Sequence, residues 1–113
     1  MPTVQQHFKG RAPAVWTIYQ QILGAAGVFG PFAQEPKKTS IHLVRKSAFA
    51  GVATRKDALI LTLKSATDIR SRRIAKREQA SAHRWHVEIR LDDPSQVDAE
   101  LKSWLKRSIE LSD

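Results

Sequence analysis

Lysine and arginine side chains are concentrated in the middle of this chain. Residues 37–90 carry fourteen Lys or Arg and four Asp or Glu, a local net charge of +10, while the whole chain has a formal net charge of +8. Cations at this density attract polyanions, because each contact with a phosphate releases a condensed counterion. The sequence therefore predicts an anionic partner. Nucleic acid fits best, because its phosphates can engage cations that are spread over a surface.

Twelve of these cationic side chains are candidate contacts for the anion. Six flank predicted strands, where flexible side chains reach outward, and the others lie in or after an arginine-rich stretch. Arginine suits this chemistry because its planar guanidinium can donate two parallel hydrogen bonds to phosphate oxygens. The candidates are Lys37, Lys38, Arg45, Lys46, Arg55, Lys56, Arg72, Arg73, Lys76, Arg77, Arg84 and Arg90.

Roles that involve no polyanion would also account for these charges. Lysines on turns and edge strands discourage sheet-to-sheet aggregation, so the basic turns would then serve solubility alone. The arginine-rich stretch would otherwise be a solvated linker, or would pair with Glu78, Glu88 and the acidic C-terminal helix. The alternative function is a protein-interaction or accessory domain, which binds an acidic protein or self-associates and has no nucleic-acid role.

The sequence has no recognisable catalytic arrangement. It contains no glycine-rich phosphate loop, no Ser-centred elbow and no catalytic pair of carboxylates. A metal-dependent nuclease needs a Lys beside its carboxylates, but the nearest pattern, Asp68 with Glu88 and Arg90, has an arginine in that place. We therefore expect a non-catalytic protein without a cofactor. An enzyme acting on a small phosphorylated compound would instead require a pocket that holds Lys38, His86 and Arg90.

His83 and His86 form the closest approach to a metal-binding pair. Residues three apart on a strand point to opposite faces, and neither a Cys nor a nearby carboxylate supplies a third ligand. His7 and His42 stand alone in the sequence, as surface or core histidines usually do. We therefore expect no metal site.

Composition and length restrict the class of protein. The 113 residues are 42% hydrophobic, enough for one core, so we expect a single domain over residues 1–113. Cysteine is absent, which fits a reducing compartment. No apolar run approaches the roughly 20 residues that span a bilayer, and residues 1–7 lack the basic and apolar regions of a signal peptide. We therefore expect a cytoplasmic protein with no membrane partner.

Two helices and four strands are predicted to position these side chains. Apolar residues spaced three and four apart predict a helix after Pro13, and a second stripe follows the helix start Asp93-Pro94-Ser95-Gln96. Alternation predicts three short strands between residues 39 and 64, and a fourth over residues 85–91. The connections between the first three have hairpin length, so these strands should pair antiparallel with their neighbours.

Residues 66–84 fit no single pattern. Ile69 and Ile74 are the only large apolar residues in this stretch, and their spacing of five suits neither a helix stripe nor strict alternation. Three conformations stay open: a ragged helix, an edge strand beside residues 85–91, or a mobile basic arm.

The predicted fold is α+β, with a four- to five-stranded antiparallel sheet and an N-terminal and a C-terminal helix packed on one face. All three tryptophans should be buried, because they fall in step with aliphatic neighbours. The opposite face, with Lys64, His86, Glu88 and Arg90, would form the contact surface together with the basic turns. The predicted core consists of Trp16, Ile18, Ile22, Leu43, Phe49, Leu61, Val87, Ile89, Leu101, Trp104 and Leu105.

Several stretches resemble one known family. They include His7-Phe8-Lys9-Gly10, Arg45-Lys46-Ser47-Ala48-Phe49-Ala50, Arg84-Trp85-His86-Val87-Glu88-Ile89-Arg90-Leu91 and Trp104-Leu105. In this order they resemble the bacterial family called domain of unknown function 5655, over nearly the whole chain. The resemblance implies a small α+β domain that occurs alone or at the end of longer proteins, some with nuclease-like or nucleic-acid-related parts. It implies no catalytic or binding residues, and residues 66–84 are least like the family.

Overall fold

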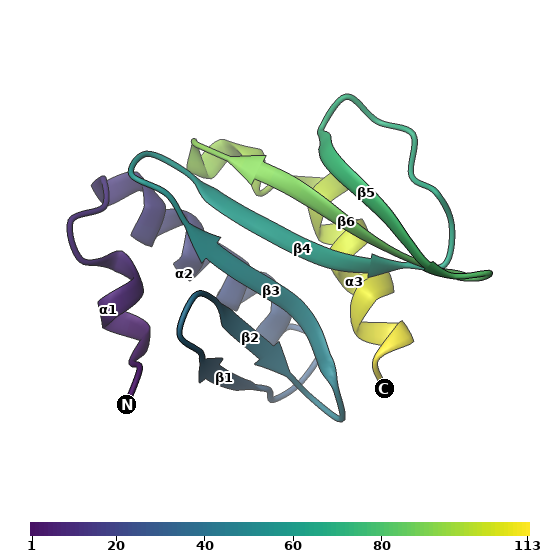
Figure 1. Cartoon of the computed structure of the whole chain (residues 1–113), viewed down its shortest axis with the longest axis horizontal. Helices are drawn as coiled ribbons and strands as arrows, with labels where there is room; N and C mark the ends of the chain where they lie inside the picture. Colours follow the sequence, from purple (N-terminus) through teal and green to yellow (C-terminus); the bar gives the residue numbers. More distant parts are fainter.

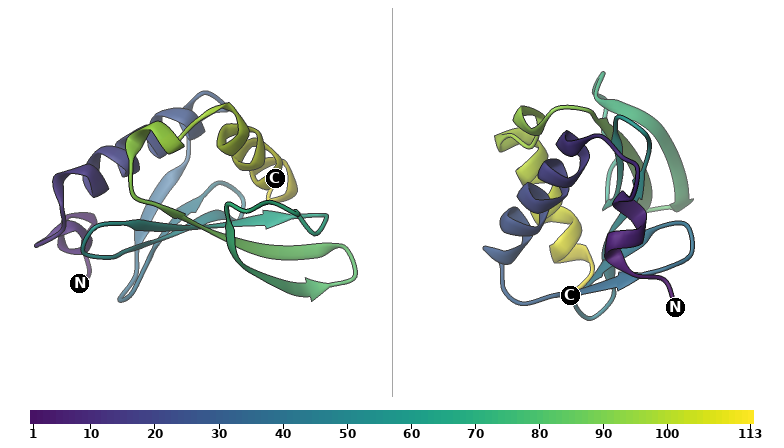
Figure 2. Two further views of the ribbon diagram at one scale, coloured as in Figure 1. Left: turned by 90° about the horizontal axis from the view of Figure 1, so that it is seen from above. Right: turned by 90° about the vertical axis from the view of Figure 1, so that its left-hand side faces the viewer.

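A six-stranded antiparallel sheet, in the order β1-β2-β3-β4-β6-β5, forms the centre of the fold (Figure 1). The computed structural model describes all residues from 1 to 113. Helices α2 and α3 lie on one face of the sheet, and no helix covers the other face (Figure 2). In chain order the elements are α1 Val4–Phe8, α2 Pro13–Gly27, β1 Ala33–Pro36, β2 Ile41–Val44, β3 Ala48–Thr54, β4 Leu59–Ser65, β5 Ile74–Ser81, β6 Arg84–Leu91, a 3-10 turn Pro94–Gln96 and α3 Ala99–Leu111.

The α+β class and the two helices on one face are confirmed, but the predicted count of four or five strands is wrong. The four predicted strands correspond to β2, β3, β4 and β6, and β2, β3 and β4 pair as neighbouring antiparallel strands, as expected. The uncertain residues 66–84 contain β5, which pairs antiparallel with β6 at the edge of the sheet. Of the three conformations left open, the edge strand is therefore the one that forms.

Strand β1 is the second strand that the sequence does not predict. Its four residues pair with β2, from Ala33 opposite Val44 to Pro36 opposite Ile41, and three of the four are exposed. The strand ends at Pro36, as expected for a residue that cannot donate to a ladder. The turn that follows β1 carries two lysines, Lys37 and Lys38, at the end of the sheet.

The long helices bury the predicted apolar stripes. In α2, Pro13 occupies the first turn, where its missing N–H has no intrahelical partner. The predicted helix start at Asp93 begins the 3-10 turn instead, and α3 starts after Asp98, whose carboxylate accepts a hydrogen bond from the backbone N–H of Leu101 at 3.0 Å. No helix of the structure combines the length and the apolar character that a membrane crossing requires.

Ten of the eleven predicted core residues are buried, and the prediction for Trp16 is wrong. The Trp16 side chain is 37% exposed because it lies beside the buried stripe of α2 rather than on it. Its ring packs edge-on against Phe8 of α1, with 4.9 Å between ring centroids. Trp85, near the start of β6, is only half-buried, so its predicted burial is also wrong. Trp104 is buried as predicted.

Helix α1 is too short to show an apolar stripe, but its start carries a sequence signal. Thr3 and Gln6 form a capping box, in which the Thr3 hydroxyl accepts from the Gln6 N–H at 3.2 Å and the Gln6 side chain accepts from the Thr3 N–H at 2.9 Å. Phe8 then packs on Tyr19 of α2, with 4.9 Å between ring centroids. The contact holds α1 against the rest of the fold.

The single tyrosine provides a test of this packing. Tyr19 is fully buried, its hydroxyl donates to Gln34 Oε1 at 2.7 Å, and burial raises its pKa to about 12 from the ordinary 10.0. A raised pKa means that the unfolded chain loses this proton first, so stability should fall as the pH rises from 10 to 12. We expect tyrosinate absorbance to appear near pH 12 in the folded protein and near pH 10 in urea. Titration near pH 10 in the folded protein would contradict the burial.

Candidate anion-binding surface

Two basic turns lie at the same end of the sheet. Because the first four strands run alternately in opposite directions, the β1–β2 turn (37–40) and the β3–β4 turn (55–58) leave the sheet together (Figure 1). A backbone hydrogen bond of 2.7 Å closes each turn. The exposed cations on these turns are Lys37, Lys38, Arg55 and Lys56.

Hydrogen bonds hold the N-terminal segment against both turns. In α1, His7 Nε2 lies 2.8 Å from the carbonyl oxygen of Lys37, and it donates to that oxygen because a carbonyl can only accept. After α1, the backbone N–H of Ala12 donates to the carbonyl oxygen of Lys56 at 2.8 Å. The connection between α1 and α2 is therefore fixed beside the two basic turns.

This connection adds two more cations to the same end of the sheet. Gly10 has a φ of +74°, in the left-handed region that favours glycine, and lets the chain turn sharply between Lys9 and Arg11. Arg11 Nε donates to Thr54 Oγ1 at 3.1 Å, and the Thr54 hydroxyl donates in turn to the carbonyl oxygen of His7 at 2.5 Å. Arg11 is thus fixed at the end of β3, while Lys9 is exposed beside it.

We call these six side chains the basic end. Two acidic residues, Glu35 and Asp57, lie in the same segments, and Lys37 Nζ is 3.4 Å from Glu35 Oε1. Both members of this ion pair are about half exposed, so it is weak and leaves Lys37 able to exchange partners. The sequence predicts four of the six cations and misses the two that lie alone in the N-terminal segment. The basic end consists of Lys9, Arg11, Lys37, Lys38, Arg55 and Lys56.

Other predicted anion contacts lie at the opposite end of the sheet. Arg45, in the β2–β3 turn, has a half-buried side chain that donates to the carbonyl oxygen of Phe29 at 2.6 Å and pairs with Asp113 at 3.1 Å. Lys46 in the same turn is exposed, and Arg84 at the start of β6 is half-buried. Arg45 therefore anchors the C-terminal residue instead of facing a partner.

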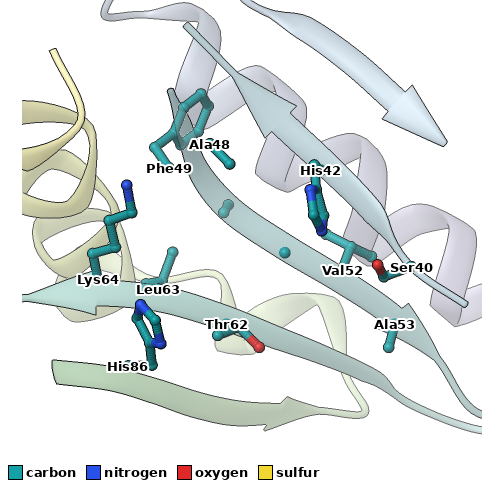
Figure 3. A pocket seen from close by; sticks show the side chains of 12 residues that line it. Ser40, His42, Ala48, Phe49, Val52, Ala53, Thr62, Leu63, Lys64 and His86 are labelled. Atoms are coloured by element: carbon teal, nitrogen blue, oxygen red, sulfur yellow. The ribbon is translucent and has the colours of Figure 1, made fainter. Parts of the chain in front are cut away.

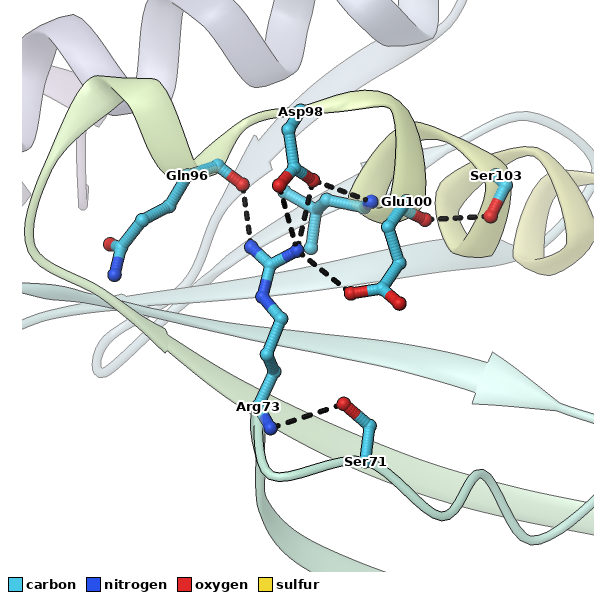
Figure 4. A network of polar contacts seen from close by, with 7 residues as sticks. Ser71, Arg73, Gln96, Asp98, Glu100 and Ser103 are labelled. Carbon is cyan, nitrogen blue, oxygen red and sulfur yellow. Dashed lines mark hydrogen bonds and ion pairs between the residues drawn. The ribbon is translucent and has the colours of Figure 1, made fainter.

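Arg73 is the most heavily engaged of the predicted contacts (Figure 4). Its Nη1 lies 2.9 Å from Asp98 and 3.1 Å from Glu100, its Nη2 donates to the carbonyl oxygen of Gln96 at 2.6 Å, and its guanidinium lies 5.6 Å from the Trp104 ring centroid. The side chain is only 23% exposed. Arg73 therefore joins the segment before β5 to the start of α3, and both of its terminal nitrogens already have acceptors in this chain.

The pKa values of this cluster agree with the contacts. Burial alone would lower the pKa of Arg73, but hydrogen bonds to Asp98 and Glu100 outweigh it and raise the pKa above its ordinary value. The pKa of Asp98 is lowered from 3.8, first by the Leu101 N–H and then by Arg73. Both shifts favour the charged forms of Arg73 and Asp98 at neutral pH.

The remaining cations of the arginine-rich stretch are divided between acids and solvent. Arg77 Nε and Arg70 Nη2 each lie 2.9 Å from a carboxylate oxygen of Asp68, and Arg90 Nη1 lies 3.1 Å from Asp92. Lys76 is exposed opposite Glu88 in the β5–β6 register, and Arg72 is exposed before β5. The twelve predicted residues therefore do not form one surface: four gather at the basic end and the rest are dispersed or paired.

A hollow of about 310 Å³ lies on the face of the sheet that no helix covers (Figure 3). Its floor is formed by the small residues of β3, and Gly51 is the central one because it pairs with His42 on one side and Thr62 on the other. His42, Lys64 and His86 stand around it (Figure 3). A pocket for a small phosphorylated substrate would have to hold Lys38, His86 and Arg90 together. Of these three residues only His86 lines the hollow.

One family model matches the chain. The model described as Domain of unknown function (DUF5655) covers residues 4–112. The chain belongs to this family. No curated protein and no solved structure matches it. The match to the DUF5655 family confirms the resemblance seen in the sequence, and the description of the family assigns no activity.

Within this DUF5655 domain, both the basic end and the hollow lie inside the matched residues. No group of three or more His, Asp or Glu side chains comes together in a way that could hold a metal ion. What the fold assembles is a set of exposed cations beside an open sheet face.

Proposed function

We propose that this domain is a non-catalytic module that binds nucleic acid through the basic end. The observation that carries the proposal is the meeting of three segments, distant in sequence, whose cations gather at one end of the sheet. Six cations share this end with two acids, and the six lie on backbone that hydrogen bonds hold in place. A fixed set of exposed cations suits a chain of phosphates, which needs several contacts at once.

The contrast with the other cations supports the choice of this surface. Arg45, Arg73, Arg77 and Arg90 each lie within 3.1 Å of a carboxylate of this chain, so binding a phosphate would first require them to leave it. At the basic end only Lys37 has an acidic partner, and that contact is 3.4 Å long and exposed. A phosphate that binds at the basic end therefore contacts several cations and has to replace fewer carboxylate contacts than it would elsewhere.

The test is a salt titration of binding to mixed-sequence DNA and RNA. We expect the protein to bind in about 50 mM salt and its affinity to fall steeply as salt is added. The triple variant Lys38→Ala, Arg55→Ala, Lys56→Ala should bind more weakly and should reduce the slope of log affinity against log salt by about 2 to 3, because three phosphate contacts are lost.

A matched control removes the same charge elsewhere. Lys102→Ala, Lys106→Ala, Arg107→Ala changes three exposed cations of α3 and should leave the salt slope unchanged. Undetectable binding by the unmodified protein in about 50 mM salt would defeat the proposal. An equal loss in both triple variants would show that net charge alone is responsible. If neither nucleic acid binds but the protein sediments as a dimer, the protein-interaction alternative is favoured.

A further inference from the structure

We propose that the domain prefers single-stranded over double-stranded nucleic acid, because an unpaired base enters the hollow on the open face of the sheet. This inference rests on the proposed function, since it takes the basic end as the site of phosphate contact. It adds a second contact, with the base, in a place that the basic end does not include.

The hollow exists because its central position has no side chain. Cross-strand neighbours on one face of a sheet have their Cβ atoms about 4.5–5.5 Å apart, so a row of ordinary side chains would fill the surface. In the row His42, Gly51, Thr62 the middle member is glycine, and Ala53 and Ala48 on the same strand are also small. A Cβ built at Gly51 would lie 3.6 Å from Thr62 Cβ. The volume of about 310 Å³ is at the lower end of the range for small-ligand sites.

The residues around the hollow suit a planar, uncharged ring with a phosphate on either side. His42 of β2 and His86 of β6 each present an imidazole, and such rings stack on unpaired bases. Lys64 places an ammonium group at one end of the hollow (Figure 3). At the other end lie Ser40 and Ala53, the first of which belongs to the β1–β2 turn of the basic end.

The hollow and the basic end lie one after the other along strand β3. Strand β3 runs under it from Ala48 to Ala53 and then enters the basic turn at Arg55. At about 3.3 Å per residue this path is about 16 Å long, enough for two or three nucleotides of a single strand. A strand whose phosphates contact Lys38 and Arg55 can therefore continue over β3 toward Lys64.

Acidic residues beside the hollow restrict where phosphates can lie. Glu35 is opposite His42 on β1, and Glu88 is opposite Thr62 on β6, next to Lys76 of β5. These carboxylates flank the hollow on both sides and disfavour a phosphate over its middle. The base is the part of the nucleotide that can occupy it. In a duplex the base is paired and stacked, so only an unpaired strand can place it there.

The experiment compares a single-stranded oligonucleotide with the duplex of the same sequence at equal salt. A duplex has the higher charge density, so phosphate contacts alone would favour it. We expect the single strand to bind about tenfold more tightly, as one stacked base allows. The variant Gly51→Val, which fills the hollow, should lose this preference and keep its affinity for duplex. Ala80→Val, a matched change at an exposed position of β5, should alter neither.

Two further measurements separate the possible failures. The first uses an abasic single strand, which keeps the phosphates but lacks the bases. Its affinity for the unmodified protein should be no higher than the affinity of the normal strand for Gly51→Val. The double variant His42→Ala, His86→Ala removes both rings without filling the hollow and should also weaken single-strand binding about tenfold. Equal binding of single strand and duplex, unchanged by these variants, overturns the inference and leaves the proposed function standing. No binding of either form overturns the proposed function itself.

Discussion

Replacing Ser108 by alanine is expected to destabilise the fold by about 2–4 kcal/mol, because two backbone groups would lose their hydrogen-bond partner. Ser108 lies on α3 and is fully buried. Its hydroxyl donates to the carbonyl oxygen of Phe49 at 2.5 Å and accepts from the backbone N–H of Lys64 at 2.9 Å. These two groups lie next to Ala50 and Leu63, the last paired residues of the β3–β4 ladder, where the strands no longer bond to each other.

Urea unfolding measures this effect through the shift in midpoint at constant slope. The matched control is Ser103→Ala on the same helix. The Ser103 hydroxyl is exposed and bonds only to the carbonyl oxygen of Glu100 within the helix, at 2.6 Å, so its loss should change stability by less than about 0.5 kcal/mol. If Ser108→Ala were as stable as Ser103→Ala, water or a strand shift would have to satisfy both backbone groups, and the role given to the hydroxyl would be wrong.

The Ser108 contact also connects the core to the candidate binding face. Phe49 and Lys64 are both among the residues that line the hollow. The hydroxyl therefore fixes the separation of β3 and β4 at the end of the hollow where Lys64 stands. Because this end of the hollow is already rigid, no conformational entropy is lost in ordering it when a ligand binds, which lowers the free-energy cost of association.

The sequence predicts those strands whose two faces differ. In β4, Leu59, Leu61 and Leu63 face the core while Ile60, Thr62 and Lys64 face outward, so the alternation is visible without a structure. In β5, seven of eight residues are exposed, and two irregularities in its pairing with β6 break the register. No apolar row remains to detect, because the strand is held by ladder hydrogen bonds at the edge of the sheet rather than by burial.

The candidate site is less predictable than the fold because it depends on which cations find partners. Arg73 and Asp98 are 25 positions apart, and nothing in the local sequence of either residue indicates that they meet. In the same way, Lys9 and Arg11 join the basic end because their segment bonds to Lys37, Lys56 and Thr54, which are far from it in sequence. Charge density along the chain predicts a basic surface, but it does not distinguish the cations that remain free from those that pair with acids.

Replacing Arg73 by methionine is expected to destabilise the fold by about 2–3 kcal/mol while leaving nucleic-acid binding unchanged. Exposed ion pairs are worth little, but this guanidinium is three-quarters buried, contacts two carboxylates and satisfies the carbonyl oxygen of Gln96. Methionine keeps the apolar stem and removes the charge and the donors. Arg72→Met changes the exposed neighbour, which has no acidic partner, and should cost less than about 0.5 kcal/mol.

The pH dependence of stability identifies the electrostatic part of the Arg73 effect. The pKa of Asp98 is lowered in the folded protein by the Leu101 N–H and by Arg73, so the charged carboxylate stabilises the fold above its ordinary pKa of 3.8. This stability is lost as the pH falls through the lowered pKa. Urea unfolding at neutral pH should therefore separate Arg73→Met clearly from the unmodified protein, and acid should bring the two closer together. If the difference in stability stayed constant into acid, the effect would come from packing against Trp104 instead. If Arg73→Met bound nucleic acid more weakly, Arg73 would have to be part of the binding surface.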